Sequence, residues 1–345
     1  MINLSINRIS SFAYEHRKII LGAATCALTL LFLRRHQKNK AMPPVEVLRS
    51  KQIKTLPDLV QAKTTQQLAS LYFIRNKPSD ALAEVMHLLM HESPASSLSL
   101  DEIVTKTQQA WFRKNRWEVQ EDDAAMIELA PKVDPLLKRL GIMETFIPEG
   151  PYDTALLLGG RANLFISRLD SLLTAIKDRR IQVSIIDILI GTQPLHPSEL
   201  EILATSCHQI TGAKTEHDMA IAVAERMIKP LGIDYHIIPT DFGDKKPSTE
   251  QTIDTWIKVT GQNRKRVLII SDPQFAVYQY FQCFESFFRN HFAGTYCVFV
   301  NSLDAKDFKR LKVEEETIPR SLHLDTISRT IFTLRSQISR GYFSL

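Results

Sequence analysis

The sequence predicts an α/β protein whose Rossmann-like parallel sheet, with helices on both faces, follows an N-terminal membrane helix and a helical region. From residue 151 onward, short apolar runs alternate with longer amphipathic stretches, as is typical of a parallel sheet covered on both faces. Residues 42–150 have helical periodicity instead, and an apolar run between basic residues lies near the N-terminus. We therefore expect three parts: a membrane anchor at 1–41, a helical region at 42–150 and a Rossmann-type α/β domain at 151–345.

The composition is that of a globular protein. Hydrophobic residues make up 44% of the chain and charged residues 23%, so a sizeable core is expected. The net charge of +5 argues weakly for an anionic surface partner. No zinc-finger spacing or RNP-like aromatic motif indicates nucleic acid. The four cysteines form no C-x-x-C pair, so neither a metal motif nor a redox motif is expected.

The segment HRKIILGAATCALTLLFLRRHQKNK places an uncharged, mainly apolar run, Ile19 to Leu33, between two basic flanks. A helix over this run would be about 22 Å long, which is shorter than the ~30 Å hydrocarbon core. Snorkelling Lys and Arg side chains at both ends make up the difference. We expect a single-pass anchor in the lipid bilayer. A cleaved signal and a soluble helix are alternatives, although Arg34 and Arg35 stand where small residues precede a cleavage site.

The basic flanks also bear on orientation. More basic residues follow the apolar run than precede it, and the positive-inside rule then favours a body on the cytoplasmic side.

The helical region contains recognisable helix starts. Ser79 and Asp80 follow Pro78 as a cap, and Ser99 has Glu102 at the capping-box distance.

The α/β part predicts five strands and five helices. The expected strands are Thr154–Leu158, Ser184–Ile190, Tyr235–Ile238, Arg266–Ser271 and Tyr296–Asn301. The expected helices are Leu164–Asp178, Glu216–Lys229, Glu250–Thr260, Phe275–Phe292 and Asp325–Gln337. Because right-handed crossovers bring the carboxyl ends of parallel strands to one edge, a ligand is expected at that edge.

The loop after the first strand reads LGGRANLFISRL and contains Gly159, Gly160, Arg161 and Arg168. Two glycines permit a positive φ and a close backbone approach, and a helix N-terminus beside an arginine suits an anion. We expect these four residues to bind a ligand, with Arg161 or Arg168 supplying the charge. In the alternative, Arg168 pairs with a structural carboxylate such as Glu216.

Two further helix starts add polar side chains. In KTEHDM, Thr215 is a candidate helix cap and Glu216 follows it, and PSTEQT places Thr249 and Thr252 on roughly one helix face. Glu216 either belongs to the helix cap, where the dipole stabilises a carboxylate, or serves a ligand as hydrogen-bond acceptor or general base. The hydroxyls of Thr249 and Thr252 cap the helix, bind a phosphate or carboxylate, or do both.

The fourth segment is VLIISDPQF, in which Ser271 and Asp272 follow a strand. Asp272 is placed to bind a ribose, a metal or the protein's own turn. No metal triad, Gly-x-Ser-x-Gly or Walker A motif is present. No metal site is therefore expected, and whether the protein is an enzyme is left open.

Four segments together resemble the YdcF-like superfamily, which includes SanA/ElyC-like envelope proteins: YDTALLLGGRANLFISRL, TEHDMAIAVAERM, PSTEQTIDTW and VLIISDPQFAVYQ. The resemblance covers roughly residues 152–300 and rests on the order of the segments. The matching positions are Leu158-Gly159, Arg168-Leu169, Glu216 with Met219, Thr249 with Thr252, and Ser271.

This resemblance implies a Rossmann-like fold, an envelope-related role with the body on the periplasmic side, and S-adenosylmethionine as a candidate ligand. The chain also departs from the family. Many members place a histidine after the late strand, where this chain has Pro273-Gln274-Phe275, and the Asn after the Thr-containing helix start is missing. Chemistry that depends on that histidine is therefore in doubt.

These observations predict a membrane-anchored protein that binds a small anionic or nucleotide-like ligand at the strand ends. One reading is an enzyme with Glu216 as base and Arg161 and Arg168 as anion anchors. Another is a binding or regulatory module without catalytic machinery. The third is a non-catalytic, membrane-tethered interaction protein, or a secreted host-directed one, whose helical region contacts protein partners.

Overall fold

The computed structural model describes residues 65–91, 97–113, 122–143, 150–206, 208–243, 245–260, 263–292, 295–300, 305–312 and 319–342. The predicted anchor, Ile19 to Leu33, lies outside these residues. Within the described ranges, no helix has both the length and the apolar character needed to cross a membrane.

The centre of the fold is a parallel sheet of five strands in the order β7-β6-β4-β8-β9. The strands are β4 (Thr154–Leu158), β6 (Ile186–Gly191), β7 (Tyr235–Thr240), β8 (Arg266–Ser271) and β9 (Thr295–Val300). The chain runs outward from β4 through β6 to β7, then returns to β8 and continues to β9. This is a doubly wound, Rossmann-like arrangement with its switch point between β4 and β8. The predicted parallel sheet is confirmed, with β4 and β8 at the expected bounds.

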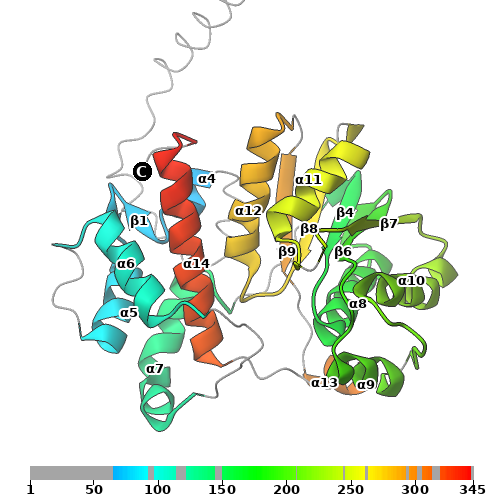
Figure 1. The fold of residues 1–345 in the computed structure, drawn as a ribbon, viewed down its shortest axis with the longest axis horizontal. Helices are drawn as coiled ribbons and strands as arrows, with labels where there is room; N and C mark the ends of the chain where they lie inside the picture. The colour runs from blue at the N-terminus through cyan, green and yellow to red at the C-terminus, as the bar shows by residue number, and fades with distance from the viewer. Residues whose placement is uncertain are drawn as a thin grey trace, which may run out of the picture. The chain divides into compact units, whose positions relative to one another are not determined.

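Helices cover both faces of this sheet (Figure 1). On one face lie α8 (Ala162–Lys177), α9 (Pro197–Thr205) and α10 (Glu216–Met227), and on the other α11 (Thr249–Val259) and α12 (Ala276–Arg289). Alternate strand residues such as Ala155 and Leu157 pack with Phe165 of α8 and Met219 of α10 in one buried cluster. The period-two alternation of a strand explains this division.

Two short strands form a separate two-stranded sheet at the amino ends of β4 and β6. β3 (Gly150–Tyr152) directly precedes β4, and β5 (Ile181–Val183) precedes β6. They pair in parallel with each other. Neither β3 nor β5 was predicted from the sequence.

The helical region comprises α4 (Thr65–Ala69), α5 (Asp80–Met90), α6 (Leu100–Ala110) and α7 (Ala124–Arg139), with a small hairpin of β1 (Phe73–Ile74) and β2 (Lys77–Pro78). Two predicted helix starts are confirmed. Ser79 caps α5, and Ser99 forms a capping box with Glu102 at the start of α6.

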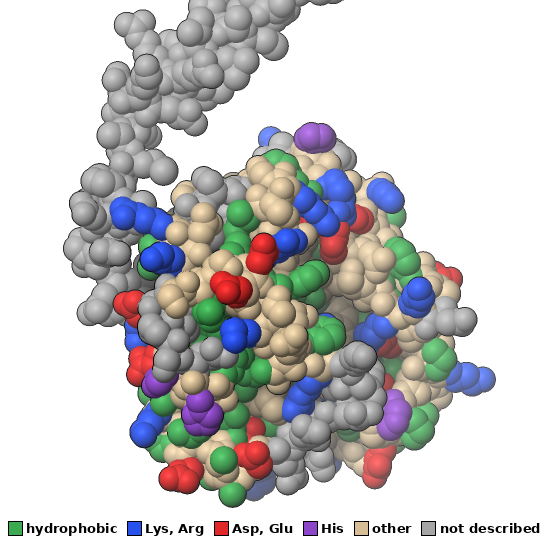
Figure 2. Space-filling view, turned by 60° about the vertical axis from the view of Figure 1, so that its left-hand side comes forward, with side chains coloured by type: hydrophobic (Ala, Val, Ile, Leu, Met, Phe, Trp, Pro, Cys, Tyr) green, Lys and Arg blue, Asp and Glu red, His purple; other side chains and the backbone are tan. Residues whose placement is uncertain are grey.

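The last described helix, α14 (Arg320–Ser339), packs on α12 of the α/β part and on α6 of the helical region (Figure 1). Gln337 Nε2 donates to the carbonyl of Phe281 in α12 at 2.8 Å, and Gln108 Nε2 of α6 donates to Ser328 Oγ at 2.7 Å. Figure 2 shows basic, acidic and hydrophobic side chains interspersed over the face that it presents. The short helix α13 (Ala305–Leu311) instead contacts α8, where Arg310 pairs with Asp170 at 2.5 Å.

Candidate functional site

The predicted site residues lie at the carboxyl ends of the parallel strands, as expected from the topology. They form two groups. One group surrounds the switch point between β4 and β8, and the other surrounds the end of β6 and the start of α11. The contacts within each group show what every side chain does in the folded chain.

Arg168 and Asp272 form a buried ion pair across the switch point. Each side chain is only 2% exposed. Arg168 Nε donates to Asp272 Oδ2 at 2.8 Å, and Nη1 donates to the carbonyls of Leu158 and Gly159 at 2.8 and 3.1 Å. The guanidinium therefore ties the end of β4 to the turn after β8. The alternative reading, in which Arg168 pairs with a carboxylate, describes this geometry, with Asp272 in place of Glu216.

Close packing accounts for the two glycines after β4. Neither Gly159 nor Gly160 has a positive φ, so a left-handed turn is not the reason for them. A Cβ on Gly159 would lie 3.0 Å from the carbonyl oxygen of Leu189 and 2.9 Å from Ile190 Cδ1. A Cβ on Gly160 would lie 3.3 Å from Arg168 Nη1. The expected close approach is present, and it is made to neighbouring protein groups.

The N-terminus of α8 already faces an anion of the chain itself. The backbone N–H of Ala162 donates to Glu199 Oε1 at 3.2 Å, and Glu199 is almost fully buried. Glu199 Oε2 accepts from the backbone N–H of His196 at 2.9 Å, in the capping box that starts α9. Glu199 was not predicted from the sequence, although a proline at the first helical position followed by a glutamate at N3 is typical of a helix start. Arg161, the residue before Ala162, is the N-cap of α8.

Glu216 forms an ion pair at the end of β6. Thr215 caps α10 as predicted, with Asp218 as the reciprocal partner of the capping box. Glu216 Oε1 lies 2.6 Å from Lys246 Nζ, and its Oε2 would lie 2.6 Å from a Cβ on Gly191. Glu216 therefore requires a glycine at the end of β6 and a lysine from the loop before α11. Neither Gly191 nor Lys246 was predicted from the sequence.

The start of α11 is capped by Ser248, one residue before the predicted Thr249. Ser248 and Gln251 form a reciprocal capping box. Thr252 Oγ1 donates to the carbonyl of Thr249 at 2.8 Å. The capping role therefore belongs to Ser248, and the ligand-binding role of Thr249 and Thr252 stays a prediction.

Two buried acceptors are left over in the turn after β8. Ser271 Oγ donates to Gln279 Oε1 at 2.5 Å, so that hydroxyl is used within the protein. Asp272 Oδ1 and Gln274 Oε1, in side chains 2% and 1% exposed, accept no hydrogen bond from any residue that the structure describes. Leaving a buried acceptor unpaired costs about 1–3 kcal/mol. These two oxygens are therefore the strongest indication of a ligand at this edge.

A second buried carboxylate lies within the sheet. Asp187 of β6 accepts from Thr154 Oγ1 at 3.0 Å and from Trp256 Nε1 at 2.8 Å, and its Oδ1 lies 3.1 Å from His236 Nδ1. Both carboxylate oxygens have partners, so this network holds α11 against the sheet.

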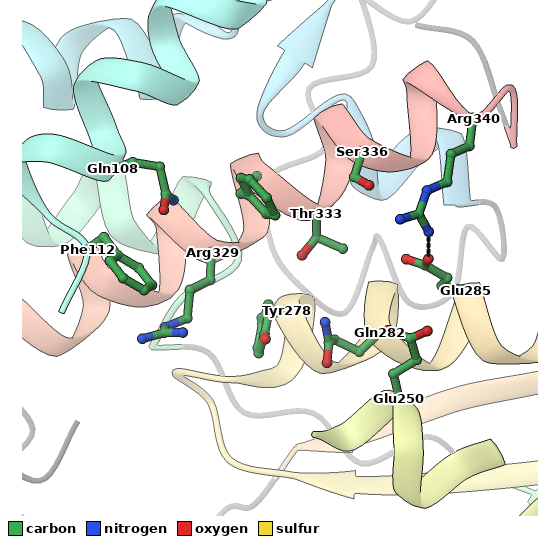
Figure 3. Close-up of a pocket in the computed structure, with 11 residues that line it drawn as sticks. Gln108, Phe112, Glu250, Tyr278, Gln282, Glu285, Arg329, Thr333, Ser336 and Arg340 are labelled. Carbon is green, nitrogen blue, oxygen red and sulfur yellow. Dashed lines mark hydrogen bonds and ion pairs between the residues drawn. The ribbon is translucent and has the colours of Figure 1, made fainter. Parts of the chain in front are cut away.

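A pocket of about 360 Å³ lies away from the strand ends, between α14, α6, α12 and the start of α11 (Figure 3). Its charged side chains are already paired: Arg340 with Glu285, Arg329 with Asp325, and Glu250 with Arg289. Aromatic and amide side chains fill the rest of its wall, among them Phe112, Tyr278 and Gln282. None of the predicted site residues lines it.

Across the described ranges, no group of three or more His, Cys, Asp or Glu side chains is arranged to hold a metal ion. No family model matches the chain, and a comparison with curated proteins finds no match. The resemblance to the YdcF-like superfamily therefore stays a prediction from the quoted motifs.

Proposed function

We propose that this chain is a membrane-tethered protein that binds a small nucleoside-like ligand, such as S-adenosylmethionine, at the carboxyl edge of its sheet. One observation carries the proposal. The turn after β8 holds two buried acceptors, Asp272 Oδ1 and Gln274 Oε1, without a donor among the described residues. They flank the switch point, where ligands of doubly wound sheets usually bind.

The contacts at this edge favour recognition through the ligand's hydrogen-bond donors. Glu199 occupies the N-terminus of α8, and Arg168 is bound to Asp272 and to two carbonyls. A phosphate at α8 would have to displace Glu199. Ribose hydroxyls and an ammonium group instead supply the donors that the two acceptors lack.

The two groups of site residues lie within reach of one ligand of this size. β6 and β8 flank β4, so their ends are about 10 Å apart at ~4.8 Å per strand. A nucleoside-like ligand bound to Gln274 would extend towards Glu216 and Lys246. Because Asp272 and Gln274 are almost fully buried, the turn from Asp272 to Phe275 has to open. A catalytic role for Glu216 and an envelope-related role for the protein stay predictions.

Calorimetric titration of the full-length protein in detergent tests the proposal, with S-adenosylmethionine, adenosine and inorganic phosphate as probes. We expect the nucleoside probes to bind, and Gln274→Met to weaken them at least tenfold, or about 1.4 kcal/mol. Gln282→Met is the matched control, because the same substitution there removes an unpartnered buried oxygen of α12, away from the strand ends. It should leave the affinity unchanged.

Unchanged nucleoside affinity in Gln274→Met would overturn the proposed site. Binding of phosphate without binding of either nucleoside probe would overturn the proposal that the ligand is nucleoside-like. A melting curve of each variant separates loss of binding from loss of the fold. Removing an unpaired acceptor should leave the melting temperature unchanged or raise it.

A further inference from the structure

Basic side chains gather at the amino ends of the strands, opposite the proposed ligand edge. We call them the amino-end patch: Lys177, Arg179, Arg180, Arg264, Lys265 and Arg266. They come from two segments, one running from the end of α8 to β5 and the other from the loop after α11 to the first residue of β8. All are exposed except Arg264, which is partly buried.

A surface depression of about 500 Å³ lies within this patch. Gly150, Pro151, Arg179, Arg180 and Gln182 line it. The guanidinium of Arg266 reaches the same place, since its Nη2 would lie 3.3 Å from a Cβ on Gly150. Arginines from the α8–β5 loop and from the start of β8 therefore converge on one concave surface.

Two carboxylates adjoin the residues of the amino-end patch, and both are engaged. Asp153 Oδ2 accepts from the backbone N–H groups of Lys265 and Arg266 at 2.7 and 3.1 Å. Asp178 pairs with Arg180 at 3.5 Å. The patch therefore has an excess of positive charge, which fits an anionic partner.

The described chain begins on the same side of the sheet. Thr65 Oγ1 lies 3.2 Å from the hydroxyl of Tyr280, whose ring packs against Tyr296 at a centroid distance of 5.1 Å. Tyr296 stands opposite Val267 in the sheet, one residue after Arg266. Residues 34–64 join the predicted anchor to this point. The described part of the chain therefore begins on the amino-end side of the sheet, the side of the amino-end patch.

We propose that the amino-end patch rests on the anionic phospholipid headgroups of the membrane that holds the chain. This inference rests on the membrane tether of the proposed function. Each Lys or Arg near an anionic leaflet adds to the attraction, and the attraction falls off within a Debye length. The carboxyl edge then faces away from the bilayer, where a dissolved ligand reaches it.

Hydrogen exchange of the full-length protein in lipid nanodiscs tests the contact. Discs of phosphatidylcholine alone are compared with discs that also contain phosphatidylglycerol. We expect exchange in peptides covering residues 177–184 and 263–267 to slow at least threefold in the anionic discs only. About 0.5 M NaCl should abolish the difference, and so should the double variant Arg179→Glu with Arg180→Glu.

The matched control reverses two exposed lysines at the opposite edge, Lys309 of α13 and Lys312 just after it. Lys309→Glu with Lys312→Glu should leave the protection of the patch unchanged. Equal exchange in neutral and anionic discs overturns the proposal.

Carbonate extraction separates the patch from the tether. If carbonate removes full-length protein with an intact N-terminus from membranes, the proposed membrane tether is disproved. Flotation of the same protein with phosphatidylglycerol vesicles then still supports the patch, and failure to float overturns it. Ligand titration in detergent tests the proposed site at the carboxyl edge and depends on neither the tether nor the amino-end patch.

Discussion

At the scale of single residues, the ion pair between Arg168 and Asp272 shows that the arginine at the strand ends has a structural role. Both side chains are buried, and four hydrogen bonds from the guanidinium go to protein acceptors. A buried pair adds little net stability compared with apolar residues, because both charges lose their hydration. Losing one partner costs far more, because the other charge stays buried.

Arg168→Met should therefore destabilise the fold by about 3–5 kcal/mol, because it leaves Asp272 buried and unpaired. The double variant Arg168→Met with Asp272→Leu should be more stable than Arg168→Met alone. Arg310→Met is the control, since Arg310 is 52% exposed and an exposed pair contributes less than ~1 kcal/mol. Urea unfolding measures all three. A loss no larger than that of the control would contradict the structural role.

The sequence indicated that Arg168 needs either a ligand or a carboxylate. It did not identify the carboxylate, because Asp272 lies 104 residues away and several acidic residues follow predicted strands. Lys246 and Gly191 were missed for the same reason. Their importance depends on the packing of Glu216 between two loops, which has no local pattern.

At the scale of elements, strands were easier to predict than their connections. β4 and β8 are short runs of apolar residues between polar ones, and such runs have clear ends. α9 was not predicted, because it is only 9 residues long and its N-cap is His196, which is not one of the usual capping residues. The start of α11 was assigned one residue late, because Ser248 and Thr249 are both capable of capping.

The loop from β4 to α8 gives a prediction at this scale. Gly159→Ala should destabilise the fold by about 1–3 kcal/mol, because the new Cβ meets the β6 backbone at Leu189, which cannot move aside cheaply. Gly160→Ala should cost less, because its Cβ meets only the end of the Arg168 side chain. Thermal unfolding of the two variants compares them directly. A larger loss in Gly160→Ala would show that the Arg168 guanidinium cannot shift to make room for the new Cβ.

Helix α14 gives a prediction of pH dependence. Burial lowers the pKa of His323 to about 4, with Arg320 adding to the effect and Asp134 and Asp122 opposing it. In the unfolded chain this histidine has its ordinary pKa of about 6.5. Between about pH 4 and about pH 6.5, the unfolded chain therefore binds the proton more readily than the folded chain does. The free energy of unfolding is consequently at its full value above about pH 6.5 and falls as the pH drops towards 4.

Between about pH 7 and about pH 5, the loss from His323 should be about 2 kcal/mol. Urea unfolding at the two pH values measures the slope. His323→Gln should flatten it, whereas His291→Gln, at an exposed position, should not. If His323→Gln and the unaltered chain keep the same slope, His323 is not the group that titrates.

At the scale of the molecule, α14 joins regions that are far apart in the sequence. Arg320 bonds to Asp134 of α7 at 2.7 Å and to Asp122 at 2.9 Å, and Gln337 bonds to α12. Lys54–Leu345 forms one compact unit. The sequence suggested a boundary near residue 150, because the hydrophobic period changes there. It could not show that the last helix packs on the first ones.

The contacts of α14 imply that the helical region and the sheet unfold together. Trp111 is buried at the end of α6, and Trp256 is buried in α11. The fluorescence of Trp111 therefore reports on the helical region, and that of Trp256 reports on the α/β part. In variants that keep a single tryptophan, the fluorescence midpoint in urea should coincide with that of far-UV circular dichroism. Arg320→Ala, which removes the bonds of α14 to Asp134 and Asp122, should lower the midpoint reported by both tryptophans. If it lowers only the midpoint reported by Trp111, the helical region is a separate folding unit, and α14 holds the two together without making them cooperative.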